Sequence, residues 1–152
     1  MANKQDVAEI QGHLKPLLGQ KPWRVATGLG TSITMEFGKP IMLSPKAKTT
    51  NGEWSLWIST ACWRLETSEE VLVGSGDAQD KVEFSLKQME NLSLQTIELF
   101  PPSLETTFNF ENGKALRVFP TNSQGEICWQ LLMPGRNALA VGPNSSWVFE
   151  KA

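Results

Sequence analysis

The sequence has no tyrosine, a single histidine and only two cysteines among its 152 residues. His13 cannot supply the paired imidazoles of a zinc site, and Cys62 and Cys128 stand far apart instead of in C-x-x-C spacing. A hydrolytic triad would have to recruit His13 together with an unremarkable serine or one of these cysteines. We therefore predict no metal site and no set of catalytic residues.

Glycine-rich nucleotide sites are also missing. The segment GLGTSI begins like a dinucleotide fingerprint, but Ile33 stands where the third glycine should be and strands follow it. The segment GSGD precedes a helix, but Asp77 and Asp80 at that helix end would repel a phosphate. We interpret the first segment as a turn and the second as a capped linker, and we predict no cofactor.

Neither a basic excess nor a long apolar run is present. The 14 Lys and Arg residues and 16 Asp and Glu residues give a net charge of −2, without the basic patch that nucleic-acid binding requires. No stretch reaches the roughly 18 apolar residues of a membrane span, and the N-terminal MANKQDVAEIQ lacks the apolar core of a signal peptide. We expect a cytoplasmic protein that binds neither nucleic acid nor membrane. Cys62 and Cys128 lie in the apolar segments STACWRL and EICWQLL, so we expect buried, reduced thiols.

What the sequence does contain is an internal repeat. The segment MEFGKPIMLSP, residues Met35–Pro45, aligns without a gap with FENGKALRVFP, residues Phe110–Pro120. The tetrapeptides Trp63–Glu66 and Trp147–Glu150 also align between the two halves of the chain, and we interpret their tryptophans as structural residues. The pattern predicts two tandem units, about 1–74 and 75–152, packed as one domain, 1–152, and related by a pseudo-twofold axis.

Each unit reads as one short helix followed by antiparallel strands, which predicts an α+β fold. Helices are expected at about 4–15, after an Asn3 cap, and at about 78–90, after an Asp77 cap. Alternating apolar residues elsewhere predict strands joined as a meander. Hairpin turns are expected at Asn112–Gly113, at the equivalent Gly38, and at Asn51–Gly52 and Pro134–Gly135.

Two groups of residues are candidate binding positions. Trp57 alternates with Trp54, Leu56 and Ile58, so it should lie on the opposite, exposed face of its strand. Arg117 alternates with Leu116 and Val118 and shares its face with Phe119; a guanidinium beside an aromatic ring can anchor a carboxylate or a partner loop. Arg64 lies in similar apolar surroundings. Each of these side chains has an ordinary alternative, as a covered aromatic or a solvent-facing strand residue.

The repeat also makes Glu36 and Glu111 equivalent, and a pair of carboxylates about 5 to 10 Å apart is what glycoside hydrolysis uses. The alternative is that E-x-G-K forms a charged turn rim in which Glu36 and Lys39 are solvated. We prefer the second interpretation and predict that the protein is not an enzyme.

The hairpin FNFENGKALRVFP, the strand segment WQLLMPGRNALAV and the closing SSWVFE resemble small uncharacterised bacterial proteins, some of them found among the immunity proteins of polymorphic toxin systems. The resemblance covers mainly residues 104–150. It implies a cytoplasmic, non-enzymatic protein that acts by occluding a partner.

Three functional hypotheses follow, in order of preference. The first is a protein that binds a protein partner or itself, with a homodimer through an exposed sheet edge as one form. The second is a small-ligand binding module that uses a groove between the two units. The third is a hydrolase that uses Glu36 and Glu111.

Overall fold

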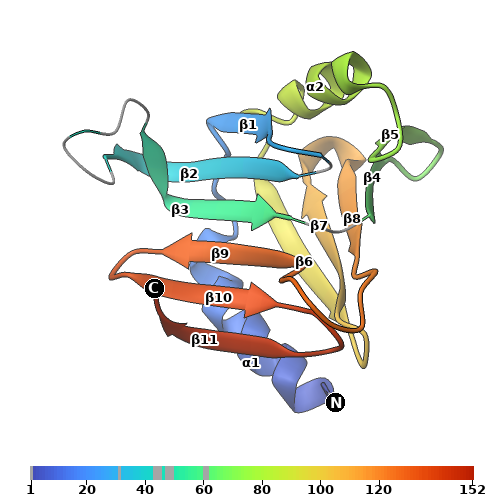
Figure 1. Ribbon diagram of the computed structural model, residues 1–152. Coiled ribbons are helices and arrows are strands. Elements are labelled where there is room, and N and C mark those ends of the chain that lie inside the picture. Colours follow the sequence, from blue (N-terminus) through green and yellow to red (C-terminus); the bar gives the residue numbers. More distant parts are fainter. Residues whose placement is uncertain (1, 31, 43–45, 47–49, 60–61) are drawn as a thin grey trace.

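The computed structural model describes residues 2–30, 32–42, 46, 50–59 and 62–152. It is an α+β structure of two antiparallel sheets and two α-helices, as the sequence predicts (Figure 1). The α-helices are α1 (Lys4–Leu14) and α2 (Gln79–Lys87), and short 3₁₀ turns are η1 (Lys15–Leu17) and η2 (Glu111–Gly113). The strands are β1 (Arg24–Thr27), β2 (Ile33–Ile41), β3 (Asn51–Ile58), β4 (Cys62–Glu66), β5 (Val71–Gly74), β6 (Leu94–Phe100), β7 (Glu105–Phe110), β8 (Ala115–Phe119), β9 (Trp129–Met133), β10 (Asn137–Val141) and β11 (Trp147–Lys151).

The strand order mixes the two halves of the chain. Sheet A has six strands in the order β1-β2-β3-β9-β10-β11, and sheet B has five in the order β5-β4-β8-β7-β6. The first three strands of each half form a meander, and the next strands cross to the other sheet: β9 pairs with β3, and β4 pairs with β8. Each sheet is therefore completed by strands from the other half.

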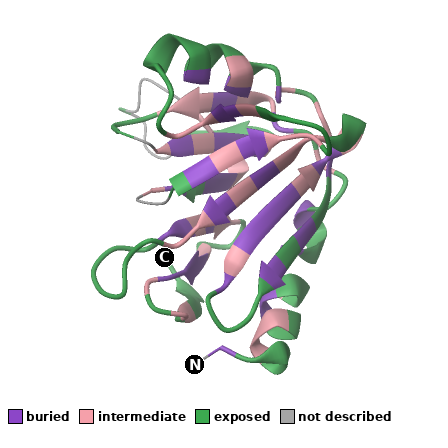
Figure 2. Ribbon diagram, turned by 90° about the vertical axis from the view of Figure 1, so that its right-hand side faces the viewer, coloured by how far each residue is buried: buried purple, intermediate pink, exposed green. Residues whose placement is uncertain are grey.

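The core lies between the sheets and follows the two-residue period of the strands. Inward-facing residues of sheet A, such as Met35, Phe37 and Leu131, are at most 1% exposed, and those of sheet B, such as Phe108 and Leu116, are equally buried. Figure 2 shows the buried residues running along the strands, whereas the helices are exposed over much of their surface.

The helices close two sides of this sandwich. Helix α1 inserts Ile10 and Leu14 into the core and packs on β6, and α2 inserts Val82 and Leu86 and packs on β1 and β5. Figure 1 places α2 at the end of the molecule near β1 and α1 behind β9, β10 and β11. None of the helices in the described part of the chain has the length and apolar character needed to cross a membrane.

The predicted caps are confirmed for one helix only. Asn3 caps α1 in a capping box: its side chain accepts the Asp6 N–H, and the Asp6 carboxylate accepts the Asn3 N–H. The predicted Asp77 cap is wrong, because Ala78 occupies the cap position of α2. Asp77 instead accepts the N–H of Gly74 at 2.8 Å and closes the turn before the helix.

Two predicted turns are confirmed and two are wrong. Asn112–Gly113 joins β7 to β8 and Pro134–Gly135 joins β9 to β10, with positive φ at both glycines. Gly38 lies inside β2, at a bulge between Phe37 and Pro40, and Asn51–Gly52 lies inside β3. The β2–β3 hairpin thus extends past the predicted turns; we call the described residues of its outer legs, 38–42 and 50–52, the arm. Leu43 and Pro45 of the repeat match lie outside the described residues.

A buried tryptophan lies at the start of each crossing strand. Trp63 at the start of β4 and Trp129 at the start of β9 are 3% and 0% exposed, and both belong to the short sequence C-W-x-L. Trp147, which the repeat alignment matches with Trp63, lies in β11, the edge strand of sheet A, and is partly buried against the core. The prediction that Cys62 is buried is also wrong: Cys128 is buried, but Cys62 alternates with inward-facing Trp63 and is exposed.

Candidate functional site

Arginines from two distant segments meet on the outward face of sheet B. Arg64 of β4 and Arg117 of β8 are direct cross-strand partners in the antiparallel ladder. Their neighbours Leu65, Leu116 and Val118 point into the core, so both guanidinium groups lie on the outer face, as predicted for Arg117. Like charges directly opposite each other are unfavourable in a sheet, so this pair requires a compensating group.

Glu66 is that group. Its Oε1 atom accepts hydrogen bonds from Nε of Arg64 and from Nε of Arg117, both at 2.7 Å. The hydrogen bond from Arg64 and the charges of both arginines lower the pKa of the Glu66 carboxyl, against a smaller opposing effect of burial. One carboxylate thus accepts hydrogen bonds from two guanidinium groups, and the three side chains together carry a net positive charge.

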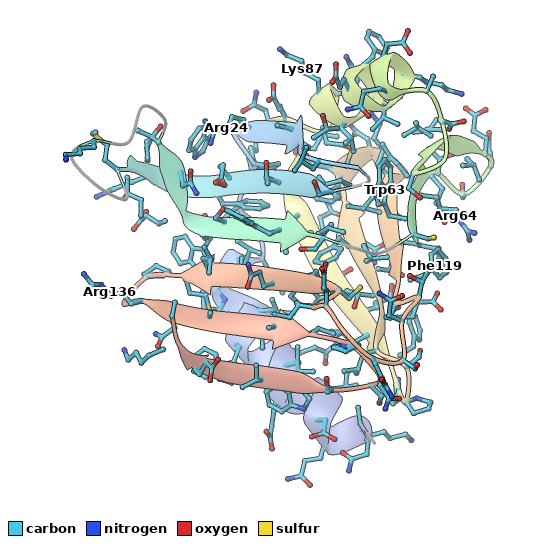
Figure 3. All side chains as sticks on the ribbon, in the orientation of Figure 1. Arg24, Trp63, Arg64, Lys87, Phe119 and Arg136 are labelled. Carbon is cyan, nitrogen blue, oxygen red and sulfur yellow. The ribbon has the colours of Figure 1, made fainter. Side chains whose placement is uncertain are left out.

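Phe119 completes this group of side chains. The Arg64 guanidinium carbon lies 5.3 Å from the centre of the Phe119 ring, which is cation–π geometry. Arg117 also donates from Nη1 to the Thr107 hydroxyl at 3.3 Å. Figure 3 shows Arg64 and Phe119 next to each other at the side of the molecule remote from the arm. We call Arg64, Glu66, Arg117 and Phe119 the arginine cluster; its arrangement suits a carboxylate or another planar anion.

The outward face of sheet A has a different character. Glu36 of β2 is only 1% exposed, although it points away from the core between inward-facing Met35 and Phe37. The prediction that Glu36 is solvated at a turn rim is wrong, because the strand continues beyond it and the arm folds against it. Its carboxyl oxygens both lie 2.7 Å from the Ser55 hydroxyl, and Trp57 Nε1 donates to the same hydroxyl at 2.6 Å.

Trp23, which directly precedes β1, and Arg24, the first residue of β1, hold the arm in place. Trp23 Nε1 donates to the Gly38 carbonyl at 2.9 Å, and Arg24 donates to the Thr50 carbonyl at 2.7 Å. The same Arg24 side chain lies 4.0 Å from a Glu36 carboxyl oxygen. Burial raises the pKa of Glu36, while Ser55, Arg24 and the Gly52 backbone N–H act in the opposite direction. A carboxyl group buried in this way binds its proton more tightly than one in water.

A cavity of about 370 Å³ lies beside this network, between the arm and the β9–β10 turn. Its lining combines residues from both halves of the chain: Ile41, Asn51, Gly52, Glu53 and Ser55 from the first, and Leu132, Met133, Pro134, Gly135, Arg136, Asn137 and Ala152 from the second. Figure 3 shows Arg136 at the outer end of the β9–β10 turn.

The four predicted binding residues do not form one site. Arg64, Arg117 and Phe119 come together on sheet B, whereas Trp57, which is 37% exposed, lies on the outward face of sheet A. Glu36 and Glu111 are also separate: Glu36 lies in β2 of sheet A, and Glu111 lies in the turn after β7, where its carboxylate accepts the Ser93 N–H at 2.7 Å.

Sequence reasoning missed Glu66 and Ser55. A signal for both was present, because residues two apart on a strand share a face, which groups Glu66 with Arg64 and Ser55 with Trp57. Within the described residues, no three His, Cys, Asp or Glu side chains gather where they could hold a metal ion.

No protein-family model matches the chain, and neither a curated protein nor a solved structure is significantly similar to it.

Proposed function

We propose that this is a cytoplasmic, non-catalytic binding protein whose arginine cluster binds an acidic segment of a protein partner. The observation that carries the proposal is the direct pairing of Arg64 with Arg117 across neighbouring strands, with a single carboxylate oxygen shared between them. The cluster keeps a net positive charge on a chain whose total charge is −2.

Stability alone does not account for this arrangement. The two arginine side chains are 44% and 34% exposed, and exposed ion pairs contribute at most about 1 kcal/mol to folding. Glu66 instead holds both guanidinium groups in position through their Nε atoms, and the Phe119 ring lies against that of Arg64. A pre-positioned guanidinium loses less conformational entropy when it binds a carboxylate, which favours recognition of Asp or Glu side chains.

The resemblance to immunity proteins suggests which kind of partner carries the acidic segment. In that case the acidic segment belongs to a toxin, and the protein acts by covering the toxin's functional surface. Such a role needs no catalytic group, and electrostatic attraction between the two surfaces would accelerate their association.

The test uses three matched variants, Arg64→Gln, Arg117→Gln and Arg136→Gln. The third removes an exposed arginine outside the cluster. Binding of a fluorescein-labelled, glutamate-rich peptide is followed by fluorescence anisotropy at low and physiological salt. We expect each cluster variant to bind about tenfold more weakly, and Arg136→Gln to bind like the unmodified protein.

The same variants then serve as baits for partner capture in host lysate, with circular dichroism as a check of folding. A partner retained by Arg136→Gln and lost by both cluster variants is the expected result. Equal peptide binding by all three variants, or preference for a lysine-rich peptide, would overturn the proposal.

We further propose that the chain is a duplication of a unit consisting of one helix and five strands, with the two units related by a pseudo-twofold axis. The matching strand orders β1-β2-β3-β9-β10 and β6-β7-β8-β4-β5 support it, as does the repeated C-W-x-L at the start of the crossing strands. Circular dichroism of the separated halves, 1–74 and 75–152, tests the exchange of strands that this proposal includes, because halves that complete each other's sheets should fold only together.

A further inference from the structure

The cavity between the arm and the β9–β10 turn lies on the opposite sheet from the arginine cluster and has no part in the proposed partner binding. We propose that it is a second binding site, which takes a small, uncharged and largely apolar molecule about the size of a bicyclic aromatic compound. The inference does not depend on the proposed function and can fail or succeed separately.

Volume and lining support a small apolar ligand. The cavity measures about 370 Å³, at the lower end of the roughly 300–1,000 Å³ range of small-molecule sites. Its lining includes four residues with apolar side chains, Ile41, Leu132, Met133 and Pro134. Apolar contact of this kind, with a few polar groups at the margin, is the usual composition of a ligand site.

The charges around the cavity favour a neutral molecule. Two side chains in the lining are charged, Glu53 and Arg136, and their charges are opposite. The Glu53 carboxylate already accepts the Lys39 N–H at 2.8 Å. A ligand with one net charge would therefore be attracted by one of these side chains and repelled by the other, and would lose hydration without a clear gain.

The arm wall is pre-formed, which lowers the entropic cost of binding. Trp23 and Arg24 donate hydrogen bonds to carbonyl groups on both legs of the arm. At Gly52 the arm lies so close to the Phe37 backbone that an added Cβ would collide with it. This glycine allows the close approach of β3 to β2 beside the bulge, and Ile41 at the end of β2 lines the cavity.

The test uses indole as the probe, with indole-3-acetate and tryptamine as its negatively and positively charged counterparts. Binding is followed by two-dimensional ¹H–¹⁵N NMR of the whole chain. We expect saturable shifts for indole, centred on residues 132–137 and 51–55, and at least about tenfold weaker binding of both charged compounds.

Two tryptophan variants localise the binding. Leu132→Trp fills the cavity, and Gln130→Trp adds the same side chain to the same face of β9 two residues away, outside the lining. Loss of indole binding in Leu132→Trp, with binding retained in Gln130→Trp and native circular dichroism for both, is the expected result. Absence of saturable shifts with indole, tighter binding of a charged compound, or equal binding by both variants would overturn the inference.

Discussion

Five strands of sheet A follow the same order as the five strands of sheet B, but the two sheets present opposite kinds of outward face. Sheet A carries a buried carboxyl, Glu36, beneath the arm, and sheet B carries an exposed arginine pair around Glu66. Both glutamates lie on outward faces of central strands, and their pKa values move in opposite directions: burial raises that of Glu36, and the Arg64 hydrogen bond lowers that of Glu66. The surroundings of a carboxyl, and not its place in the ladder, decide its chemistry.

The fold constrains the residues on the inward faces of the two sheets more than those on the outward faces. The inward faces of both sheets follow the same alternation of apolar residues, because they fill one core. The outward faces have no such common requirement. They are therefore the places where a cavity or a charge cluster can form without disturbing the sandwich.

The largest expected effect comes from separating the two halves of the chain. Fragments 1–74 and 75–152 each lack the strands that complete their own three-stranded meander, because β4 and β5 lie in sheet B and β9 and β10 lie in sheet A. We expect both fragments to be unfolded alone and to form a folded one-to-one complex when mixed, as measured by circular dichroism and light scattering. A fragment that folds alone as a monomer would show that its strands can pair within one unit, and that the crossing is not required.

Much of this architecture could be predicted from the sequence. The period-two alternation around Leu56 and Leu116 gave the strands and their inward faces, and Asn3 and Asn112–Gly113 marked a helix start and a hairpin turn because their chemistry is local. The crossing of β4 and β9 between the sheets could not be predicted, because strand order depends on contacts between residues far apart in the chain.

The sites were harder to predict than the fold. Alternation placed Arg117 and Phe119 on one face, but the meeting of Arg64 with Arg117 required the pairing of β4 with β8. Burial of Glu36 had no local signal, since E-F-G-K reads as a polar turn and only the bulge at Gly38 turns it into a covered strand.

A smaller effect is expected from Glu66→Gln, which removes the charge that separates the two arginines. A lowered pKa in the folded state means that the carboxylate contributes stability above its unfolded pKa, and that this contribution is lost as pH falls through the folded pKa. We expect a loss of about 1 kcal/mol at pH 7 that shrinks as the pH falls below 4.5, the ordinary pKa of glutamate, and vanishes below the lowered pKa of the folded state. Urea unfolding across this pH range measures it. Glu98→Gln, an exposed substitution on β6 of the same sheet, is the control, and an equal loss in both variants would contradict the role of Glu66.

The smallest effect, and the one with the opposite sign, is expected from Glu36→Gln. A raised pKa in the folded state contributes stability that is present below the unfolded pKa and is lost as pH rises through the folded pKa. The amide can still form hydrogen bonds with the Ser55 hydroxyl and the Gly52 N–H, but it carries no charge that burial would penalise. Near neutral pH we therefore expect the variant to be as stable as the unmodified protein or more stable, by up to about 1 kcal/mol, with the difference shrinking towards pH 4. Urea unfolding at several pH values, with exposed Glu150→Gln as the control, measures this difference. A variant that is destabilised at pH 7 and recovers in acid would mean that the charge attraction between Glu36 and Arg24 outweighs the cost of burial, and both sheets would then hold their carboxylates in the same way.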